Sequence, residues 1–474
     1  MEMLLGEEWV SRDREVEVVD PWDGSRVDTV PQASPADLDA ALDHAVAGAR
    51  VAKSMTVYER ATVLRDAANL VEARSEELAR LIAREGAKTI REARKEVARA
   101  VNTLNVSADQ SKRIVGETIP FDSFPGGENR RGWYSRVPVG VVAAITPFND
   151  PLNLVAHKVG PAIASGNAVV LKPATATPLS ALALTKAFCE AGLPGRVLQC
   201  VTGEAREMGD ALIADDRVRM VSFTGGVETG RAITRRAGLK KIGLELGSIS
   251  PVVVWEDADF EWAVEQCVSG AFWAAGQNCI GVQRLYVHDR LYDRFRDAFV
   301  AEAGSYRVGP KLDERTDIGT LIDEKNARRV EGMVREAAAA GARVLTGGER
   351  DGCSMRPTVL ECVPLDAKVH CEEVFGPTVN LYRVKTFDDT IAQVNSLPFG
   401  INAAFFTRDV GTAFRAAEEI EAGTVIINDS TDYRLDAMPF GGVKNSGVGR
   451  EGVRFAIDEM TEPKVVCFTF PPSR

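Results

Sequence analysis

The stretch Val139-Gly140-Val141-Val142-Ala143-Ala144-Ile145 is almost wholly apolar, and Thr146-Pro147-Phe148-Asn149 follows it. A short apolar run bounded by turn residues is typical of a strand buried on both faces of a parallel sheet. Similar runs recur downstream, separated by helical patterns. The strands are predicted at residues 139–145, 168–171, 197–201, 218–223 and 241–246, and the helices at 152–163, 179–190, 205–213 and 227–237. This alternation predicts an α/β domain with helices on both faces of its sheet.

The remainder of the chain predicts a second α/β domain and a helical N-terminal region. Short strands are expected before residue 30, and Ser34 can cap the first of four helices that run to residue 110. The Arg and Glu residues of these helices are interpreted as solvated faces. In the second domain, strands are predicted at 252–255, 284–288, 403–406 and 424–427, and helices at 260–274, 291–303, 324–340 and 412–418.

The composition excludes several classes of function. The chain has 474 residues, 45% of them hydrophobic, which is enough for two or three domains with a large core. A net charge of -11 argues against nucleic acid as a partner. No apolar run is long enough for a membrane span, and the N-terminus lacks a secretory pattern. Eight cysteines without a CxxC pair and four scattered histidines favour a reduced, cytoplasmic protein without a metal site.

Three side chains of complementary chemistry follow predicted extended runs. Cys279 lies in Ala275-Gly276-Gln277-Asn278-Cys279-Ile280-Gly281, at a corner between a loop and a strand. Glu245 and Asn149 each end an apolar run. A thiol, a carboxylate and a carboxamide supply a nucleophile, a base and an oxyanion donor, so we interpret this set as a catalytic centre between the two domains.

With these residues placed, the chain resembles the NAD(P)-dependent aldehyde dehydrogenase superfamily along nearly all of its length. The resemblance implies a Rossmann-type cofactor domain (1–113 and 138–246), a catalytic domain (247–448) and a small β oligomerisation element (114–137 and 449–474) that builds a homodimer or homotetramer. Seven motifs carry it in order: Thr146-Pro147-Phe148-Asn149, Lys172-Pro173-Ala174, Phe223-Thr224-Gly225-Gly226, Glu245-Leu246-Gly247, Gly276-Gln277-Asn278-Cys279, Glu373-Val374-Phe375-Gly376-Pro377 and Pro439-Phe440-Gly441-Gly442.

The resemblance also implies a mechanism. Cys279 attacks an aldehyde to form a thiohemiacetal, while the Asn149 side chain and the Cys279 N–H stabilise the oxyanion. Hydride transfer to the nicotinamide leaves a thioester, which water activated by Glu245 hydrolyses to the free carboxylate. Lys158 and Glu451 match a supporting pair that relays the proton. Two alternatives are a cysteine-dependent hydrolase, which needs no nicotinamide, and a structural protein that has recruited the fold.

The expected dinucleotide site lies at a strand-to-helix turn beginning at Phe223. The segment 447–452 fits the GxGxxG pattern, but no predicted strand precedes it in a βαβ unit, so we reject it. At the position of Thr175, many NAD-dependent relatives carry a glutamate that repels a 2′-phosphate, so NADP is slightly favoured over NAD. The residues implied at this site are Ile145, Thr146, Pro147, Phe148, Lys172, Ala174, Thr175, Gly203, Phe223, Thr224, Gly225, Gly226, Leu246, Gly247, Glu373 and Phe375.

The substrate side differs from that of relatives that oxidise apolar aldehydes. Arg99, His157 and Arg434 stand where Met and aromatic residues are common, and guanidinium groups suit phosphonate, phosphate or carboxylate oxygens. We therefore predict a short anionic aldehyde, with phosphonate or phosphate ahead of carboxylate; neutral hydroxyaldehydes such as lactaldehyde are the alternative. Ser248-Ile249-Ser250 and Asn278 point to the branch that resembles lactaldehyde and phosphonoacetaldehyde dehydrogenases. The predicted substrate-binding residues are Arg99, Asp150, His157, Asn278, Ile280, Arg434 and Phe440.

Overall fold

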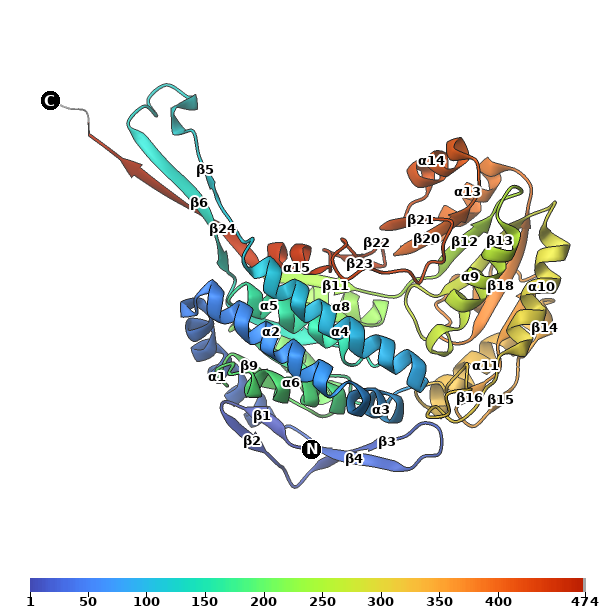
Figure 1. Cartoon of the computed structure of the whole chain (residues 1–474), viewed down its shortest axis with the longest axis horizontal. Helices are drawn as coiled ribbons and strands as arrows, with labels where there is room; N and C mark the ends of the chain where they lie inside the picture. Colours follow the sequence, from blue (N-terminus) through green and yellow to red (C-terminus); the bar gives the residue numbers. More distant parts are fainter. Residues whose placement is uncertain (472–474) are drawn as a thin grey trace.

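The computed structural model describes residues 1–471, which form two α/β domains and a projecting β arm (Figure 1). The first sheet has the strand order β2-β1-β9-β8-β7-β10-β11-β23. Its five central strands are parallel, and its edges pair antiparallel. The strands of this sheet are β1 (Met3–Leu5), β2 (Glu8–Val10), β7 (Val141–Ile145), β8 (Ala168–Lys172), β9 (Leu198–Cys200), β10 (Val218–Thr224), β11 (Lys241–Glu245) and β23 (Gly447–Val448).

The second sheet has the order β14-β17-β18-β13-β12-β20-β21, and only β14 runs antiparallel to its neighbour. Strands β14, β17 and β18 were not predicted from the sequence, although β18 lies inside the sheet between β17 and β13. The strands are β12 (Ser250–Val254), β13 (Val282–His288), β14 (Arg343–Thr346), β17 (Thr358–Glu361), β18 (Thr378–Val384), β20 (Asn402–Phe406) and β21 (Thr424–Ile427). Three pairs of short strands lie outside these two sheets: β3 (Glu15–Val19) with β4 (Arg26–Pro31), β15 (Arg350–Asp351) with β16 (Ser354–Met355), and β19 (Phe399–Gly400) with β22 (Val443–Lys444).

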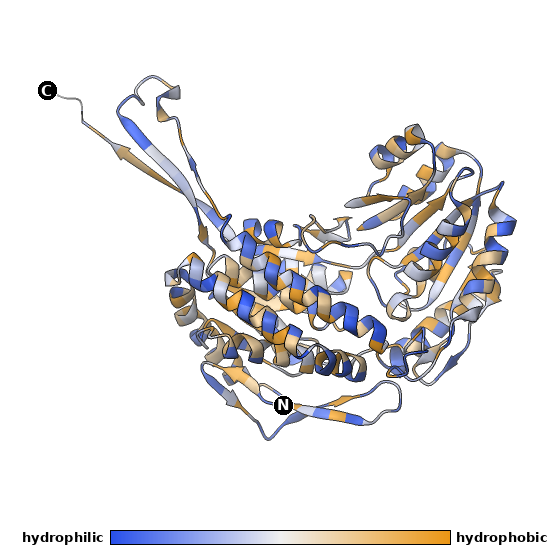
Figure 2. Ribbon diagram, in the orientation of Figure 1, coloured by the Kyte–Doolittle hydropathy of each residue, from blue (hydrophilic) through white to orange (hydrophobic). Residues whose placement is uncertain are grey.

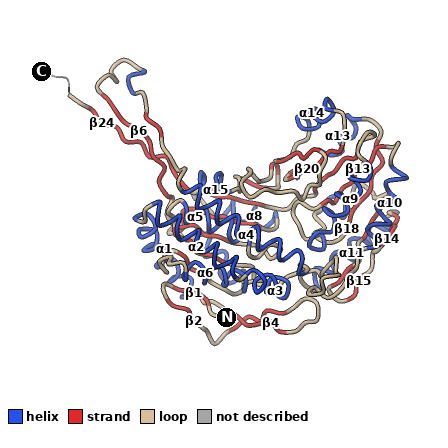
Figure 3. Tube along the Cα trace, in the orientation of Figure 1, coloured by secondary structure: helices blue, strands red, loops and turns tan. Residues whose placement is uncertain are grey.

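Helices lie against both sheets, and most of them begin within two residues of their predicted starts (Figure 3). Ser34 caps α1 as predicted, in a reciprocal capping box with Asp37. The first domain contains α1 (Pro35–Ser54), α2 (Val57–Ala73), α3 (Ser75–Glu85), α4 (Ile90–Ser111), α5 (Asn153–Ala164), α6 (Leu179–Glu190), α7 (Ala205–Ala214), α8 (Val227–Arg236) and α15 (Val453–Glu459). The second contains α9 (Phe260–Phe272), the 3-10 turn η2 (Trp273–Gly276), α10 (Tyr292–Ser305), α11 (Glu324–Ala339), α12 (Lys368–Cys371), α13 (Phe387–Asn395) and α14 (Val410–Glu419).

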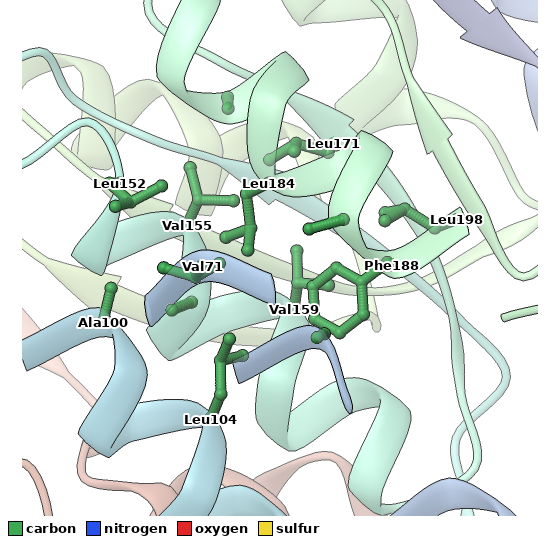
Figure 4. Packing of buried hydrophobic residues seen from close by; sticks show 14 of the residues in the cluster. Val71, Ala100, Leu104, Leu152, Val155, Val159, Leu171, Leu184, Phe188 and Leu198 are labelled. Atoms are coloured by element: carbon green, nitrogen blue, oxygen red, sulfur yellow. The ribbon is translucent and has the colours of Figure 1, made fainter. Parts of the chain in front are cut away.

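The burial pattern of β7 explains its continuous apolar sequence. Val142 and Ala144 enter one hydrophobic cluster, whereas Val141 and Ala143 enter another on the opposite face. Because side chains alternate along a strand, a sheet covered on both sides needs apolar residues at every position. Figure 4 shows part of the first cluster, where residues of α2, α4, α5 and α6 meet those of β8 and β9: Val71, Leu104, Val155, Phe188, Leu171 and Leu198.

The arm extends away from both domains and ends near the C-terminus of the chain (Figure 1). It consists of β5 (Glu117–Thr118), the turn η1 (Phe121–Ser123), β6 (Arg130–Pro138) and β24 (Thr461–Thr469), with β24 paired antiparallel to β6. Hydrophilic and hydrophobic segments alternate along it (Figure 2), and the rings of Trp133 and Phe468 lie 5.8 Å apart. Residues 449–474 were assigned to this element, but within them helix α15 was not predicted, and its Val453 and Ile457 are buried in the core of the first domain.

Candidate active site

The carboxyl ends of the central strands of the first sheet meet the nucleophile loop of the second domain around one cavity. Asn149 follows β7, Thr224 ends β10 and Glu245 ends β11. Cys279 lies on the opposite side, three residues before β13. All four line a cavity of about 280 Å³. The predicted thiol, carboxylate and carboxamide are therefore brought together between the two domains.

A strained turn leads into the nucleophile loop. Ala274, Ala275 and Gly276 have φ angles of 51°, 55° and 70°, so three successive residues adopt the left-handed region. Only glycine does so without strain. Gly276 is required for a second reason, because a Cβ atom there would lie 2.2 Å from the carbonyl oxygen of Gly376.

Two amides hold the backbone on the other side of this turn. The Gln277 side chain is buried, donates to the carbonyls of Ala274 and Thr320, and accepts from Ile322 N–H. The Asn149 side chain donates to the Gln277 carbonyl at 3.0 Å. The oxyanion donor and the nucleophile loop are thus joined directly.

The Cys279 thiol is protonated in this arrangement. Burial raises the pKa of Cys279 to about 12, and the nearby Glu373 carboxylate contributes to the rise. Arg434 acts in the opposite direction. A thiolate is the reactive form of cysteine, so nucleophilic attack requires that a base in the cavity accepts the proton.

Glu245 has the properties of such a base. Burial raises the pKa of Glu245 well above its ordinary value, and the neighbouring Glu451 adds to the shift. Its Oε2 atom is buried without a hydrogen-bond partner within residues 1–471. Its Oε1 atom lies against Gly441, where an added Cβ would approach it to 2.8 Å. A carboxylate with a raised pKa is a stronger proton acceptor than an ordinary one.

Of the two neighbouring carboxyl groups, Glu245 and Glu451, it is Glu451 that carries the negative charge. It accepts a bond from Lys158 Nζ at 2.8 Å and one from Arg434 Nη2 at 3.0 Å. Burial alone would raise the pKa of Glu451, but Lys158 and Arg434 hold it well below its ordinary value. The pair predicted from the sequence is therefore present, and Arg434 joins it.

The predicted substrate arginines have acidic partners. Arg99 Nη2 lies 3.0 Å from Asp436 Oδ1 and Arg99 Nη1 lies 3.8 Å from Asp150, whereas Arg434 stacks on the Phe440 ring at 3.8 Å. Both arginines line the cavity with Cys279. Their Nε atoms are buried and have no partner within the described chain. Each guanidinium therefore retains a free N–H donor.

The structure does not bring His157 to this cavity. The side chain is buried on α5, where Nε2 lies 3.1 Å from Asp436 and 3.4 Å from Thr103 Oγ1. Burial lowers the pKa of His157 to about 4, so the ring is neutral near pH 7. It orients Asp436, the partner of Arg99, and its direct contact with substrate is not supported by this geometry.

The other predicted substrate residues all line the cavity: Asp150, Asn278, Ile280 and Phe440. Four further residues at the site were not predicted from the sequence. Lys88 and Lys95 line the cavity, whereas Glu92 and Glu96 bind the backbone of the loops around it. These belong to or precede α4, whose charges were interpreted as a solvated face. Instead, Lys88 is buried and pairs with Glu96 and Asp150. The Thr89-x-x-Glu92 pattern, typical of a capping box, was the signal available in the sequence.

The turn between β10 and α8 can accept a phosphate group. Gly226 is the N-cap of α8 and has no side-chain cap, so N–H groups of the first helical turn are free to donate. Nothing lies within 4 Å of an added Cβ at Gly226. Glycine is required at Gly225, where a Cβ would lie 2.5 Å from the Phe223 ring. The site geometry therefore fits the predicted dinucleotide pyrophosphate.

Lys172 ends β8, which β7 separates from β10, and Thr175 follows three residues later. Burial lowers the pKa of Lys172 to about 8, and its Nζ donates to the Pro173 carbonyl. The Thr175 hydroxyl donates to the Gly203 carbonyl at 3.1 Å. The backbone of Thr146 donates to the Lys172 carbonyl, which fixes the Ile145–Pro147 end of β7 beside Ala174.

Glu373 and Phe375 close the other side of the expected nicotinamide position. Glu373 accepts from Ser248 N–H at 2.9 Å, and burial raises its pKa to about 7. Gly247, next to Leu246, leaves room for it, because a Cβ there would lie 2.6 Å from the carboxylate. The rings of Phe148 and Phe375 meet edge to face at 5.7 Å. Residues from both domains thus meet beside Cys279.

No helix within the described residues is long and apolar enough to cross a membrane. No group of three His, Cys, Asp or Glu side chains among residues 1–471 is arranged to hold a metal ion.

Comparison with known proteins agrees with this site. The chain is 50% identical over 452 residues to an aspartate-semialdehyde dehydrogenase of Pseudomonas canavaninivorans, covering 95% of this chain and 96% of that protein. It is 45% identical to a 3-sulfolactaldehyde dehydrogenase of Priestia aryabhattai, covering 98% and 97%, in agreement with the predicted branch. The structure of a glyceraldehyde-3-phosphate dehydrogenase from Methanocaldococcus jannaschii complexed with NADP is 38% identical, with a TM-score of 0.93 over 97% of this chain and 100% of that one. Residues 9–466 match the model of the aldehyde dehydrogenase family, and the chain belongs to this family of NAD(P)-dependent enzymes.

Proposed function

We propose that this enzyme oxidises a short aldehyde with an anionic group to the corresponding carboxylate, by way of a thioester on Cys279. The observation that carries the proposal is that two guanidinium groups, those of Arg99 and Arg434, line the cavity that contains the nucleophile. An anionic substrate group would offset the desolvation of these cations. Charge-assisted bonds to a guanidinium are also stronger than neutral ones.

The anionic groups considered for the substrate share one chemistry. The three compared proteins are named for a carboxylated, a sulfonated and a phosphorylated aldehyde. All three groups present oxygens to a guanidinium, as does the phosphonate favoured by the sequence analysis. We keep phosphonate and phosphate ahead of carboxylate because Lys95 also lines the cavity, in addition to Arg99, Arg434 and the carboxylate-paired Lys88. The Lys95 Nζ lies over the Trp273 ring at 4.9 Å.

Each residue around the nucleophile has its own part in the proposed oxidation. Glu245 accepts the Cys279 proton, and the sulfur attacks the aldehyde carbon while the Asn149 side chain donates to the resulting oxyanion. A nicotinamide held by the residues of the cofactor site would supply the hydride acceptor, and the oxidised carbonyl carbon would then remain on Cys279 as a thioester. Glu245 then removes a proton from water, the water oxygen adds to the carbonyl carbon, and the carbon–sulfur bond breaks to restore the thiol. Lys158 and Glu451 lie behind Glu245 and can pass its proton onward.

We further propose that NADP is preferred to NAD. The proposal rests on Thr175, whose hydroxyl is engaged with Gly203, so the position that many NAD-dependent relatives fill with a glutamate carries no charge to repel a 2′-phosphate. We also propose a homodimer or homotetramer in which the arm pairs with a second copy. Val465 and Phe468 are exposed on β24, and strand edges with exposed apolar residues are typical of such contacts.

One assay tests the substrate and cofactor together. Reduction of NADP and of NAD is followed by absorbance with phosphonoacetaldehyde, glyceraldehyde 3-phosphate, sulfolactaldehyde and aspartate semialdehyde, and with neutral lactaldehyde and propanal. We expect kcat/KM for at least one anionic aldehyde to exceed that of both neutral ones by about 10-fold or more. Higher efficiency with lactaldehyde and propanal than with every anionic aldehyde would overturn the proposal.

A further inference from the structure

Two carboxylates one helical turn apart on α4 hold the two catalytic loops. Glu92 Oε1 accepts the backbone N–H of Ala274 at 2.7 Å, at the first residue of the left-handed run before Cys279. Glu96 Oε1 accepts the N–H groups of Leu152 at 2.8 Å and Asn153 at 3.1 Å, directly after the Asn149 loop. Residues four apart lie on one face of a helix, so both carboxylates point to the same side of α4.

Neither carboxylate is a surface charge. Glu92 and Glu96 have exposed fractions of 6% and 2%. The second oxygen of Glu92 accepts from the backbone and hydroxyl of Thr89, and the second oxygen of Glu96 accepts from Lys88. Burial of a carboxylate is unfavourable unless its bonds are supplied, and here every supplied bond comes from a loop or from the start of a helix.

The hydrogen bond from Ala274 to Glu92 is important because the turn that it holds is strained. A non-glycine residue in the left-handed region is strained and persists only where the surroundings hold it. Ala274 and Ala275 both adopt it, and Glu92 binds the first of them from the other domain. Without this bond, the turn can relax toward ordinary backbone angles, and the relaxation would carry Cys279 with it.

We infer that Glu92 and Glu96 are positioning residues that fix Cys279 relative to Asn149, with α4 as the rigid spacer between the two loops. This inference concerns the family reaction and is independent of which aldehyde is the substrate. A shift of about 1 Å between reacting groups can reduce a rate by about 100-fold. Loss of either carboxylate is therefore expected to lower the rate of hydride transfer with little effect on cofactor binding.

The main experiment is Glu92→Ala, with two matched controls. Thr89→Ala removes half of the same capping box but keeps the Glu92 carboxylate on Ala274. Glu59→Ala removes the equivalent carboxylate of the Thr56–Glu59 capping box on α2, which lies in a solvent-exposed position. All three variants lose helix capping, so they are expected to lower Tm by similar amounts. Only Glu92→Ala removes the bond to the nucleophile loop.

The first readout is the pre-steady-state burst of reduced nicotinamide. We expect the burst rate of Glu92→Ala to fall about 10- to 100-fold, with the NADP Kd within about 3-fold of the parent. Both controls should retain the parent rate. Glu92→Gln keeps an acceptor oxygen for Ala274 N–H and should recover most of the rate; it also replaces Glu92→Ala if that variant does not fold.

The second readout needs neither cofactor nor aldehyde. Alkylation of Cys279 by iodoacetamide is followed across pH by peptide mass spectrometry. Relaxation of the turn should expose the thiol and move its alkylation profile to lower pH in Glu92→Ala, whereas the profile stays unchanged in Thr89→Ala, Glu59→Ala and Glu96→Ala. Glu96→Ala should still slow the burst, because it releases the Asn149 loop. A profile of Glu92→Ala that is unchanged or moves to higher pH overturns the inference, as does a burst rate equal to that of Thr89→Ala.

Discussion

Arg434 donates to Glu451 across 3.0 Å, and Lys158 donates to the other oxygen of the same carboxylate. The residue expected to bind the substrate anion is therefore also a partner of the group behind the catalytic base. Substrate recognition and proton transfer share one guanidinium. The two arginines of the cavity consequently differ, since Arg99 pairs with Asp436 and has no contact with Glu451.

Arg99→Ala is expected to affect recognition alone. Loss of a charge-assisted bond removes about 1.5–3 kcal/mol, so KM for the anionic aldehyde should rise about 10- to 100-fold. Steady-state kinetics with propanal provide the internal control, because a neutral aldehyde has no anion to lose. A parallel loss of activity toward propanal would mean that Arg99 shapes the cavity and does not select the anion.

Arg434→Ala should impair both substrates, unlike the simple loss of anion binding expected from the sequence. The variant removes the free Nε donor and one of the two cations on Glu451. KM for the anionic aldehyde should rise, and kcat for propanal should also fall, by about 3- to 10-fold. Glu451→Gln is the matched comparison, since it should reproduce the propanal defect alone. Unaltered propanal kinetics in Arg434→Ala would separate Arg434 from proton transfer.

Much of the fold could be predicted because its signals are local. The helix α6 and the strand β21 have their predicted bounds, since apolar periodicity and turn residues mark both ends. Strand β18 was missed because Asn380 and Arg383 interrupt its apolar pattern. Asn380 is buried in this strand, where its side chain donates a hydrogen bond to the Val369 carbonyl. The sequence alone does not identify this partner.

The same distinction holds at the site. Strand ends placed Asn149 and Glu245 correctly near Cys279, because parallel strands deliver their carboxyl ends to one edge. The partner of Arg434 is Glu451, which arrives on a later segment. Pairings between distant segments depend on tertiary packing and leave no local pattern.

Cys279→Ala should abolish oxidation while NADP affinity stays within about 3-fold, because the cofactor residues come mainly from the first domain. Fluorescence titration with NADP and a rate assay with the best aldehyde measure the two effects. Substantial remaining turnover would remove Cys279 from the mechanism.

Thr175→Glu should shift cofactor selectivity toward NAD. A carboxylate placed beside a 2′-phosphate costs about 1–3 kcal/mol, which corresponds to about 5- to 150-fold in the ratio of kcat/KM values. Thr175→Gln is the matched control, because it adds similar bulk without charge. A parent enzyme that already rejects NADP would contradict the role given to Thr175.

Glu245→Gln should increase stability while it removes the base. Glu245 accepts the Cys279 proton before hydride transfer and activates water after it, so both the burst of reduced nicotinamide and the steady-state turnover should slow. A burst at the parent rate followed by slow steady-state turnover would confine Glu245 to thioester hydrolysis.

The stability gain should depend on pH, with a sign fixed by the raised pKa of Glu245. Between the ordinary value of 4.5 and the raised value, the folded state holds a proton that the unfolded state has released. Stability of the parent therefore falls as pH rises through this window. The amide of Glu245→Gln does not titrate, so the variant should be more stable by about 1–3 kcal/mol near pH 8 and by much less near pH 5. Thermal unfolding at both pH values measures this, with Glu261→Gln, whose side chain is 78% exposed, as the control. An equal gain at both pH values would show that the added stability comes from packing of the amide and that ionisation of Glu245 does not destabilise the folded state.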